Sequence, residues 1–170
     1  MFVILNNTAL YGPNIASYAT KITFKQDPTK EMKITNLGSG IVYEQEIELT
    51  LRDADDQIMV LDNSNQIILT SVVNSSLATV KGFNSAILKN GIAKFNNFIV
   101  VSEPGTQNIF VSATSKAINK NKLSILTGST IKDNFIEVGF RFCKPGEQIF
   151  EKECRKCSPG TYSLNWNSTQ

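Results

Sequence analysis

The sequence contains no histidine among its 170 residues. Histidine is the side chain most often used for proton transfer near neutral pH, and it is the commonest imidazole metal ligand. The sequence also lacks a G-x-S-x-G motif and a phosphate-cradling glycine loop. We therefore assign no catalytic residue, and we expect a non-enzymatic protein without a cofactor.

Long apolar runs and a concentration of one charge are absent as well. No stretch approaches the roughly 20 apolar residues that a membrane-spanning helix needs, so we expect no membrane insertion within this chain. The 17 basic and 15 acidic residues are scattered and leave a net charge of +2. Because phosphate backbones are bound by clustered basic side chains, we expect no nucleic-acid partner.

The pattern that is present is an alternation of apolar and polar residues between Tyr18 and Phe142, which has the period of a pleated strand. In the segment 44–52, Ile47, Leu49 and Leu51 should face a core. The alternate residues should face water: Glu44, Glu46, Glu48, Thr50 and Arg52. No segment shows a capped helical period that competes, so the sequence predicts an all-β fold.

The first and last strands follow the same alternation. We expect Ile22 and Phe24 to point inward in the first, and the last should bury Ile136, Val138, Phe140 and Phe142. The predicted structure is an antiparallel β-sandwich of seven or more strands over 16–142. Its core should include Ile47, Leu49, Leu51, Phe95, Val111, Val138 and Phe140.

Turn sequences separate the strands at short intervals. The sharpest is Asn90-Gly91, since a two-residue type I′ hairpin needs a positive φ at both central positions. It should join Phe83–Lys89 to Ile92–Val101. The acidic turn at Asp53, Asp55 and Asp56 lacks the glycine and glutamate of an EF-hand loop, so we interpret it as a solvated turn and predict no metal site.

The composition changes abruptly near Cys143, where cysteine, glycine, proline and charged residues replace aliphatic ones. We therefore divide the chain into a linker or preceding segment (1–15), a β-sandwich (16–142) and a small cysteine-rich segment (143–170). The three cysteines Cys143, Cys154 and Cys157 could belong to a disulfide framework, a reduced metal site or a redox pair. We favour a disulfide framework, since a zinc site lacks a fourth ligand and a redox pair lacks its βαβ context.

Several motifs of the central region resemble the immunoglobulin-like repeats of filamin and of bacterial invasin-type proteins. Those repeats combine an acidic D-x-D-x-Q turn, a V-x-N-G-x-A-x-F hairpin and a closing P-G. The matching residues here are Asp53-Ala54-Asp55-Asp56-Gln57, Val80-Lys81-Gly82, Leu88-Lys89-Asn90-Gly91-Ile92-Ala93-Lys94-Phe95 and Glu103-Pro104-Gly105. The resemblance implies an immunoglobulin-like sandwich.

The tail resembles the opening of an ephrin-receptor-like or growth-factor-receptor-like cysteine-rich repeat. The resemblance rests on C-x-x-G-E at Cys143–Glu147 and on C-x-x-C-x-x-G-T-Y-S at Cys154–Ser163. Sandwich repeats that run into this module are typical of very large surface proteins of ciliated protists. The resemblance implies a Cys143–Cys154 disulfide, a Cys157 partner beyond Gln170, and a surface ectodomain that continues past both ends.

N-glycosylation sequons occur at Asn6, Asn74 and Asn167, and all three are candidate glycan sites. A glycan would require export, which agrees with an extracellular or cell-surface location. The function expected from the sequence is therefore a structural or adhesive spacer whose partners are other chains or repeats of a surface assembly. The alternatives are an intracellular filamin-like cross-linker with reduced cysteines, or an accessory domain of a larger extracellular receptor or enzyme.

Overall fold

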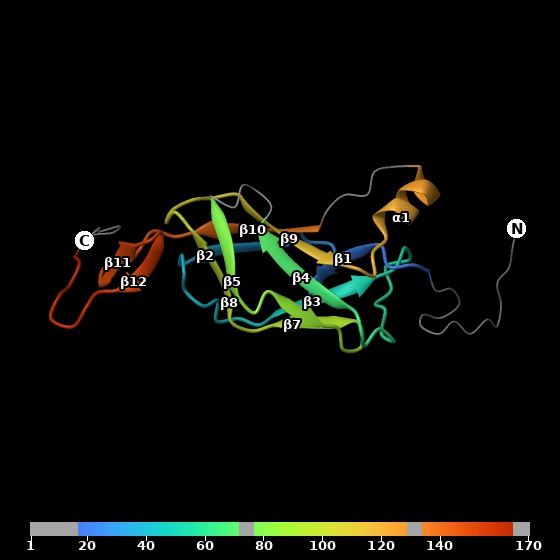
Figure 1. The fold of residues 1–170 in the computed structure, drawn as a ribbon, viewed down its shortest axis with the longest axis horizontal. Helices are drawn as coiled ribbons and strands as arrows, with labels where there is room; N and C mark the ends of the chain where they lie inside the picture. Colours follow the sequence, from blue (N-terminus) through green and yellow to red (C-terminus); the bar gives the residue numbers. More distant parts are fainter. Residues whose placement is uncertain (1–16, 72–76, 129–133, 165–170) are drawn as a thin grey trace, which may run out of the picture.

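The protein is described by a computed structural model over residues 17–71, 77–128 and 134–164. Strands dominate these residues, so the all-β prediction is confirmed. The molecule is elongated, with β1 and α1 toward one end of its long axis and the hairpin of β11 and β12 at the other (Figure 1).

The strands form two larger sheets and two strand pairs. The three-stranded sheet has the order β1 (Lys21–Phe24), β3 (Ile47–Arg52), β7 (Ile92–Phe95). The five-stranded sheet has the order β2 (Lys33–Leu37), β10 (Asn134–Phe140), β9 (Ile109–Ser115), β4 (Gln66–Ser71), β6 (Ser85–Ile87). The pairs are β5 (Ala78–Gly82) with β8 (Phe98–Ser102), and β11 (Glu147–Phe150) with β12 (Glu153–Lys156).

Both larger sheets contribute to one hydrophobic core. We call the two larger sheets, the β5–β8 pair and this core together the body of the protein. The core residues predicted from the alternation are each at most 3% exposed: Ile47, Leu49, Leu51, Phe95, Val111, Val138 and Phe140. Their burial follows from the pleat, which sends alternate side chains of each strand to the same face. This part of the prediction is confirmed.

The expectation of a wholly antiparallel arrangement is wrong at one pair. β2 runs parallel to β10, with Lys33 opposite Glu137 and Ile34 opposite Val138. Antiparallel pairing is enforced where a short turn joins two strands, whereas strands far apart in sequence are free to pair in either direction. β2 and β10 are near opposite ends of the body sequence, so no hairpin dictates their direction.

The polar face of β3 is more buried than predicted. Thr50 is fully buried and Arg52 is 9% exposed. β3 is the central strand of its sheet, with β1 and β7 on either side. The Arg52 Nε donates to the hydroxyl of Thr23 on β1 at 3.0 Å, so these polar groups satisfy one another beneath the surface.

Phe142 is also placed differently from its prediction. It is 52% exposed, and its ring lies directly over Gly105, which leaves no room for a Cβ at that position. β10 ends at Phe140, and the chain then turns toward Cys143, so the strand alternation no longer governs Phe142.

The Asn90-Gly91 turn has the predicted backbone, with φ values of 51° and 73°. Lys89 and Ile92 exchange both backbone hydrogen bonds across it, at 2.8 and 3.0 Å. The strands on its two sides then diverge, because β6 pairs with β4 while β7 pairs with β3. The turn therefore carries the chain from one sheet to the other, and the long hairpin predicted there does not form.

The prediction of no helix is wrong at α1 (Lys120–Thr127). The Asn119 side chain caps its first turn by accepting from the Lys122 N–H at 2.9 Å, and Gly128 ends it in the left-handed conformation. Only Leu123 of this helix is buried. A helix with one buried residue shows almost no amphipathic period. The sequence signal for this helix is therefore its two capping residues, Asn119 and Gly128.

Replacing Phe95 with alanine tests the core directly. The ring is 1% exposed, so we expect a loss of about 3–5 kcal/mol in the free energy of unfolding, measured by denaturant titration. Leu61→Ala is the matched control, because Leu61 is 56% exposed and should change stability by less than about 0.5 kcal/mol. A loss below about 1 kcal/mol for Phe95→Ala would contradict this core.

Candidate functional site

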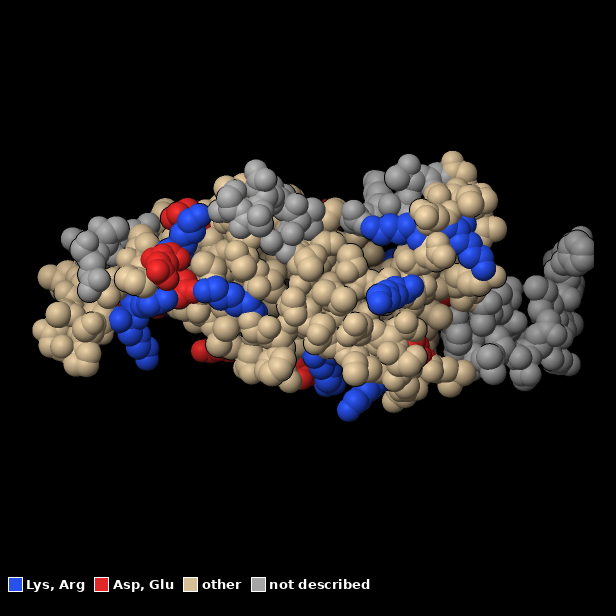
Figure 2. Space-filling view, in the orientation of Figure 1, with Lys and Arg blue, Asp and Glu red and all other residues tan. Residues whose placement is uncertain are grey.

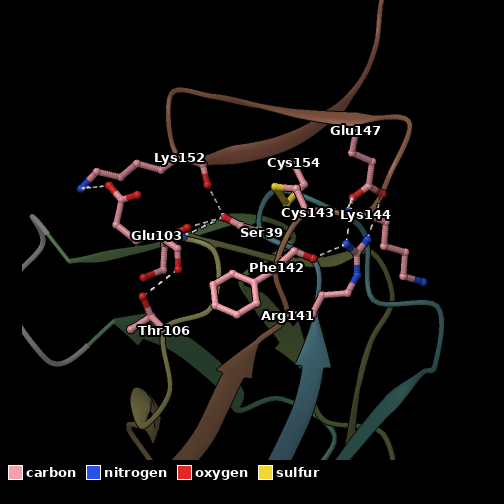
Figure 3. Close-up of a disulfide and its surroundings, with 11 residues drawn as sticks. Ser39, Glu103, Thr106, Arg141, Phe142, Cys143, Lys144, Glu147, Lys152 and Cys154 are labelled. Atoms are coloured by element: carbon pink, nitrogen blue, oxygen red, sulfur yellow. Dashed lines mark hydrogen bonds and ion pairs between the residues drawn. A yellow bond between two sulfur atoms is a disulfide. The ribbon is translucent and has the colours of Figure 1, made fainter. Parts of the chain in front are cut away.

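The candidate site is the junction between the body and the β11–β12 hairpin, where a disulfide and buried hydrogen bonds meet (Figure 3). The disulfide expected between Cys143 and Cys154 is present, with its Cα atoms 5.2 Å apart. Both cysteines are buried, at 0% and 5% exposure. The bond therefore lies between the hairpin and the body, where solvent does not reach it.

Local sequence explains why the hairpin forms here. Pro145 and Gly146 turn the chain, the Glu147 N–H donates to the Lys144 carbonyl at 2.9 Å, and Gly146 has a φ of 83°. The turn between β11 and β12 is formed by Glu151 and Lys152, whose φ values of 48° and 68° are both positive. Neither residue favours that conformation, so contacts elsewhere must hold the turn.

Ser39 supplies the central contact, and it is completely buried. Its hydroxyl oxygen lies 2.6 Å from the Ser102 carbonyl oxygen and 2.6 Å from the Lys152 carbonyl oxygen, so one hydroxyl proton faces two acceptors. The same oxygen accepts the Ser102 N–H at 3.0 Å. Ser39 therefore connects β8 of the body to the turn of the hairpin.

A backbone bond and a glycine complete this contact. The Cys154 N–H donates to the Ser39 carbonyl at 2.8 Å, and the adjacent Gly40 N–H donates to the Val100 carbonyl at 3.0 Å. Gly40 has a φ of 73°, and a Cβ there would lie 2.6 Å from Cγ of Glu153. The segment 39–40 therefore requires glycine at position 40 for both conformation and space.

An ion pair fixes the other side of the hairpin. The Arg141 guanidinium donates to both carboxylate oxygens of Glu147, at 2.8 and 3.0 Å, and the Lys144 N–H donates to the same carboxylate at 2.9 Å. The two side chains are 11% and 17% exposed. Because the pair is bidentate and mostly shielded from water, it fixes orientation better than a surface pair does.

Lys81 adds a third connection, from β5 to β12. Its ammonium lies 2.6 Å from the Glu153 carboxylate, which is 13% exposed. This hydrogen bond from Lys81, together with a weaker one from Arg155, lowers the pKa of Glu153. Glu153 therefore remains charged over the whole physiological range and keeps the strand attached to β5.

The junction also brings together three potential metal ligands, Cys143, Glu147 and Cys154, whose ligand atoms lie within 4.8 Å of one another. A zinc site requires thiolates, but here the two sulfur atoms are bonded to each other. The Glu147 carboxylate is already paired with Arg141. The donor set therefore fits a disulfide beside an ion pair and does not fit a metal centre.

The remaining candidate residues are Cys157 and the sequon asparagines. Cys157 has a free, partly exposed thiol, and its backbone N–H donates to the Gly146 carbonyl at 2.9 Å. The proposed partner of Cys157 beyond the chain stays a prediction. All three sequon asparagines fall outside the described residues: Asn6, Asn74 and Asn167.

The acidic turn is exposed at Asp55 and Asp56, as the solvated turn of the prediction requires, but not at Asp53. Asp53 is completely buried, and its Oδ1 accepts the N–H groups of Asp55 at 3.0 Å and Gln57 at 2.8 Å. Asp56 lies 3.1 Å from the ammonium of Lys21. Asp53 is therefore a structural residue that closes its own turn, which is a frequent role of aspartate.

Sequence reasoning found the cysteines of the junction but missed Ser39, Arg141 and Lys81. A Ser-Gly pair is typical of any exposed loop, and isolated basic residues carry no spacing signal.

Comparison with protein family models, with curated proteins and with solved structures gave no match. Among the described residues, no helix is both long and apolar enough to cross a membrane.

Removing the disulfide should destabilise the protein measurably. We expect the Cys143→Ala/Cys154→Ala double variant to lose about 2–4 kcal/mol of unfolding free energy in denaturant titration. Cys157→Ala is the control, because its thiol is free and its replacement leaves the junction unchanged. Equal stability of the double variant and the wild type would contradict a contribution of this bond to folding.

The ion pair predicts a specific pH dependence. Partial burial acts to raise the pKa of Glu147, but hydrogen bonds from Arg141 and Lys144 outweigh it, and the net effect lowers the pKa. A lowered folded-state pKa means that the contribution is complete above the ordinary glutamate pKa of about 4.3 and is lost as the pH falls through the folded-state value.

Glu147→Gln should therefore cost about 1–3 kcal/mol at neutral pH, and the difference from the wild type should shrink toward zero in acid. The measurement is the unfolding free energy of both proteins as a function of pH. Glu151→Gln is the control, since its carboxylate approaches Arg155 only at 3.7 Å on the surface. If Glu147→Gln lowers the unfolding free energy by the same amount at neutral and at acid pH, the charge of Glu147 does not stabilise the junction.

Proposed function

We propose that this chain is a non-enzymatic structural unit of a cell-surface or secreted protein. Its body is an immunoglobulin-like sandwich that acts as a spacer, and its hairpin begins a cysteine-rich module. The observation that carries the proposal is the disulfide-linked junction, which joins the two parts through buried contacts. Rigid joining of successive units is what a spacer requires, because a flexible joint would let the units fold back on each other.

Three independent ties support a rigid joint. The Cys143–Cys154 bond is covalent, the Ser39 contacts are buried, and the ion pairs at Glu147 and Glu153 use Arg141, just after β10, and Lys81 on β5. Ties in different directions restrict rotation as well as translation of the hairpin. A single tie would leave it free to swing.

The path of the chain supports a spacer as well. β1, which is near the start of the described residues, lies toward one end of the long axis, and the β11–β12 hairpin lies at the other end (Figure 1). A unit that the chain enters at one end and leaves at the other extends an array when it is repeated. A unit with adjacent ends would branch from an array.

The disulfide also bears on the compartment. Disulfides persist in oxidising environments and are rare in the cytosol, so a buried disulfide supports a surface or secreted protein over an intracellular cross-linker with reduced cysteines. The reduced alternative would leave two thiols buried at the centre of the joint. These thiols would contribute packing but no covalent tie.

Residual dipolar couplings of backbone amides test the rigid joint. In the oxidised protein, couplings from β11 and β12 should fit the same alignment tensor as couplings from β3 and β9. In the Cys143→Ala/Cys154→Ala variant, the hairpin couplings should decrease relative to those of the body. The Cys157→Ala variant should behave as the wild type does.

A different outcome would contradict the proposal clearly. If the hairpin of the oxidised wild type needs its own alignment tensor, the joint is flexible and the spacer function fails. If the double variant unfolds entirely, Ser39→Ala provides a milder change at the same joint. Its hairpin couplings should then decrease while the body keeps its tensor.

A further inference from the structure

An exposed apolar surface lies on α1, remote from the junction. We define the α1 patch as Tyr18, Lys122, Ile125 and Leu126. Ile125 is 81% exposed, Leu126 is 61% exposed and Tyr18 is 57% exposed. Two aliphatic side chains held this far into solvent on a capped helix are unusual for a short surface element, so the patch calls for a binding partner.

Helical geometry makes the patch continuous. Lys122 precedes Ile125 by three residues and Leu126 by four, so the three side chains are neighbours on the outer side of the helix. The Lys122 ammonium also lies 3.8 Å from the centre of the Tyr18 ring. Leu123, by contrast, is 5% exposed and is the buried residue of the helix.

The segment that contains α1 carries charge of one sign in the sequence. Between Glu103 and Asp133 the chain contains no acidic residue, whereas it contains lysines at positions 116, 120, 122 and 132. Lys116, Lys120 and Lys122 are all exposed. Basic side chains flank α1 in the space-filling view (Figure 2). A partner of this surface should therefore be negatively charged and should offer an apolar layer for the two aliphatic side chains.

We propose that the α1 patch docks on the surface of an anionic lipid bilayer. Ile125 and Leu126 enter the boundary between head groups and acyl chains, Lys122 with its neighbouring lysines faces the lipid phosphates, and the Tyr18 ring occupies the interface. Aliphatic, tyrosine and lysine side chains together are the composition found in interfacial membrane contacts. Basic residues near the surface add electrostatic attraction to anionic lipids.

The position of the patch suits this role. α1 and the β11–β12 hairpin lie toward opposite ends of the long axis (Figure 1), so contact at α1 leaves the hairpin free to continue away from the lipid surface. This inference goes beyond the proposed spacer function. The two fail separately, because lipid binding does not depend on rigidity at Ser39, and rigidity does not depend on Ile125.

Sedimentation with vesicles tests the docking, using the 170-residue chain with its disulfide formed. Vesicles of phosphatidylcholine with phosphatidylserine should bind the protein, and binding should weaken as salt is added. Vesicles of phosphatidylcholine alone should bind much less. Ile125→Asp should reduce binding to the anionic vesicles about tenfold or more, because it removes an inserted side chain and adds a negative charge.

Leu61→Asp is the matched control, since it makes the same change of charge at a side chain that is 56% exposed outside the patch. It should bind nearly as the wild type does, whereas Lys116→Gln should weaken binding to anionic vesicles. Thermal unfolding of each variant checks that the fold is intact. Equal binding to both vesicle types, equal binding of Ile125→Asp and wild type, or no binding by the wild type would each overturn the proposal.

Discussion

The arrangement of this protein depends on one buried serine. The Ser39 hydroxyl contacts the carbonyl groups of Ser102 and Lys152, and the Ser39 carbonyl accepts the Cys154 N–H. A buried polar group that loses a partner costs about 1–3 kcal/mol, so these contacts form together or are all weakened. The position of the hairpin is consequently coupled to β8 and to the loop after β2, which carries Ser39.

This coupling explains features that are unfavourable when considered alone. Lys152 adopts a positive φ without being glycine or asparagine, but its carbonyl is thereby presented to Ser39. Gly40 likewise has a positive φ, and it allows Glu153 to pack where a side chain would stand. The disulfide and these polar contacts hold the hairpin in the same position. Local strain and long-range contacts are therefore two parts of one structure.

The sequence predicted the features that depend on short-range alternation and on turn chemistry. Phe95 is buried because β7 alternates, and Asn90 adopts its positive φ because the turn demands it. Sheet order could not be predicted the same way, so the burial of Arg52 on the central strand of its sheet was missed. The Cys143–Cys154 bond was anticipated only through a resemblance. Ser39 carries no pattern at all, since its role arises from residues distant in sequence.

Native-state hydrogen exchange of the Cys154 amide tests the central claim most directly. This N–H donates to the Ser39 carbonyl, so the claim that the hairpin and the body form one cooperative unit concerns this bond itself. The account predicts that it exchanges only through global unfolding, with the same opening free energy and denaturant dependence as the slowest amides of β3 and β9. Exchange at a much lower free energy, with little dependence on denaturant, would show that the hairpin opens independently and would contradict the account.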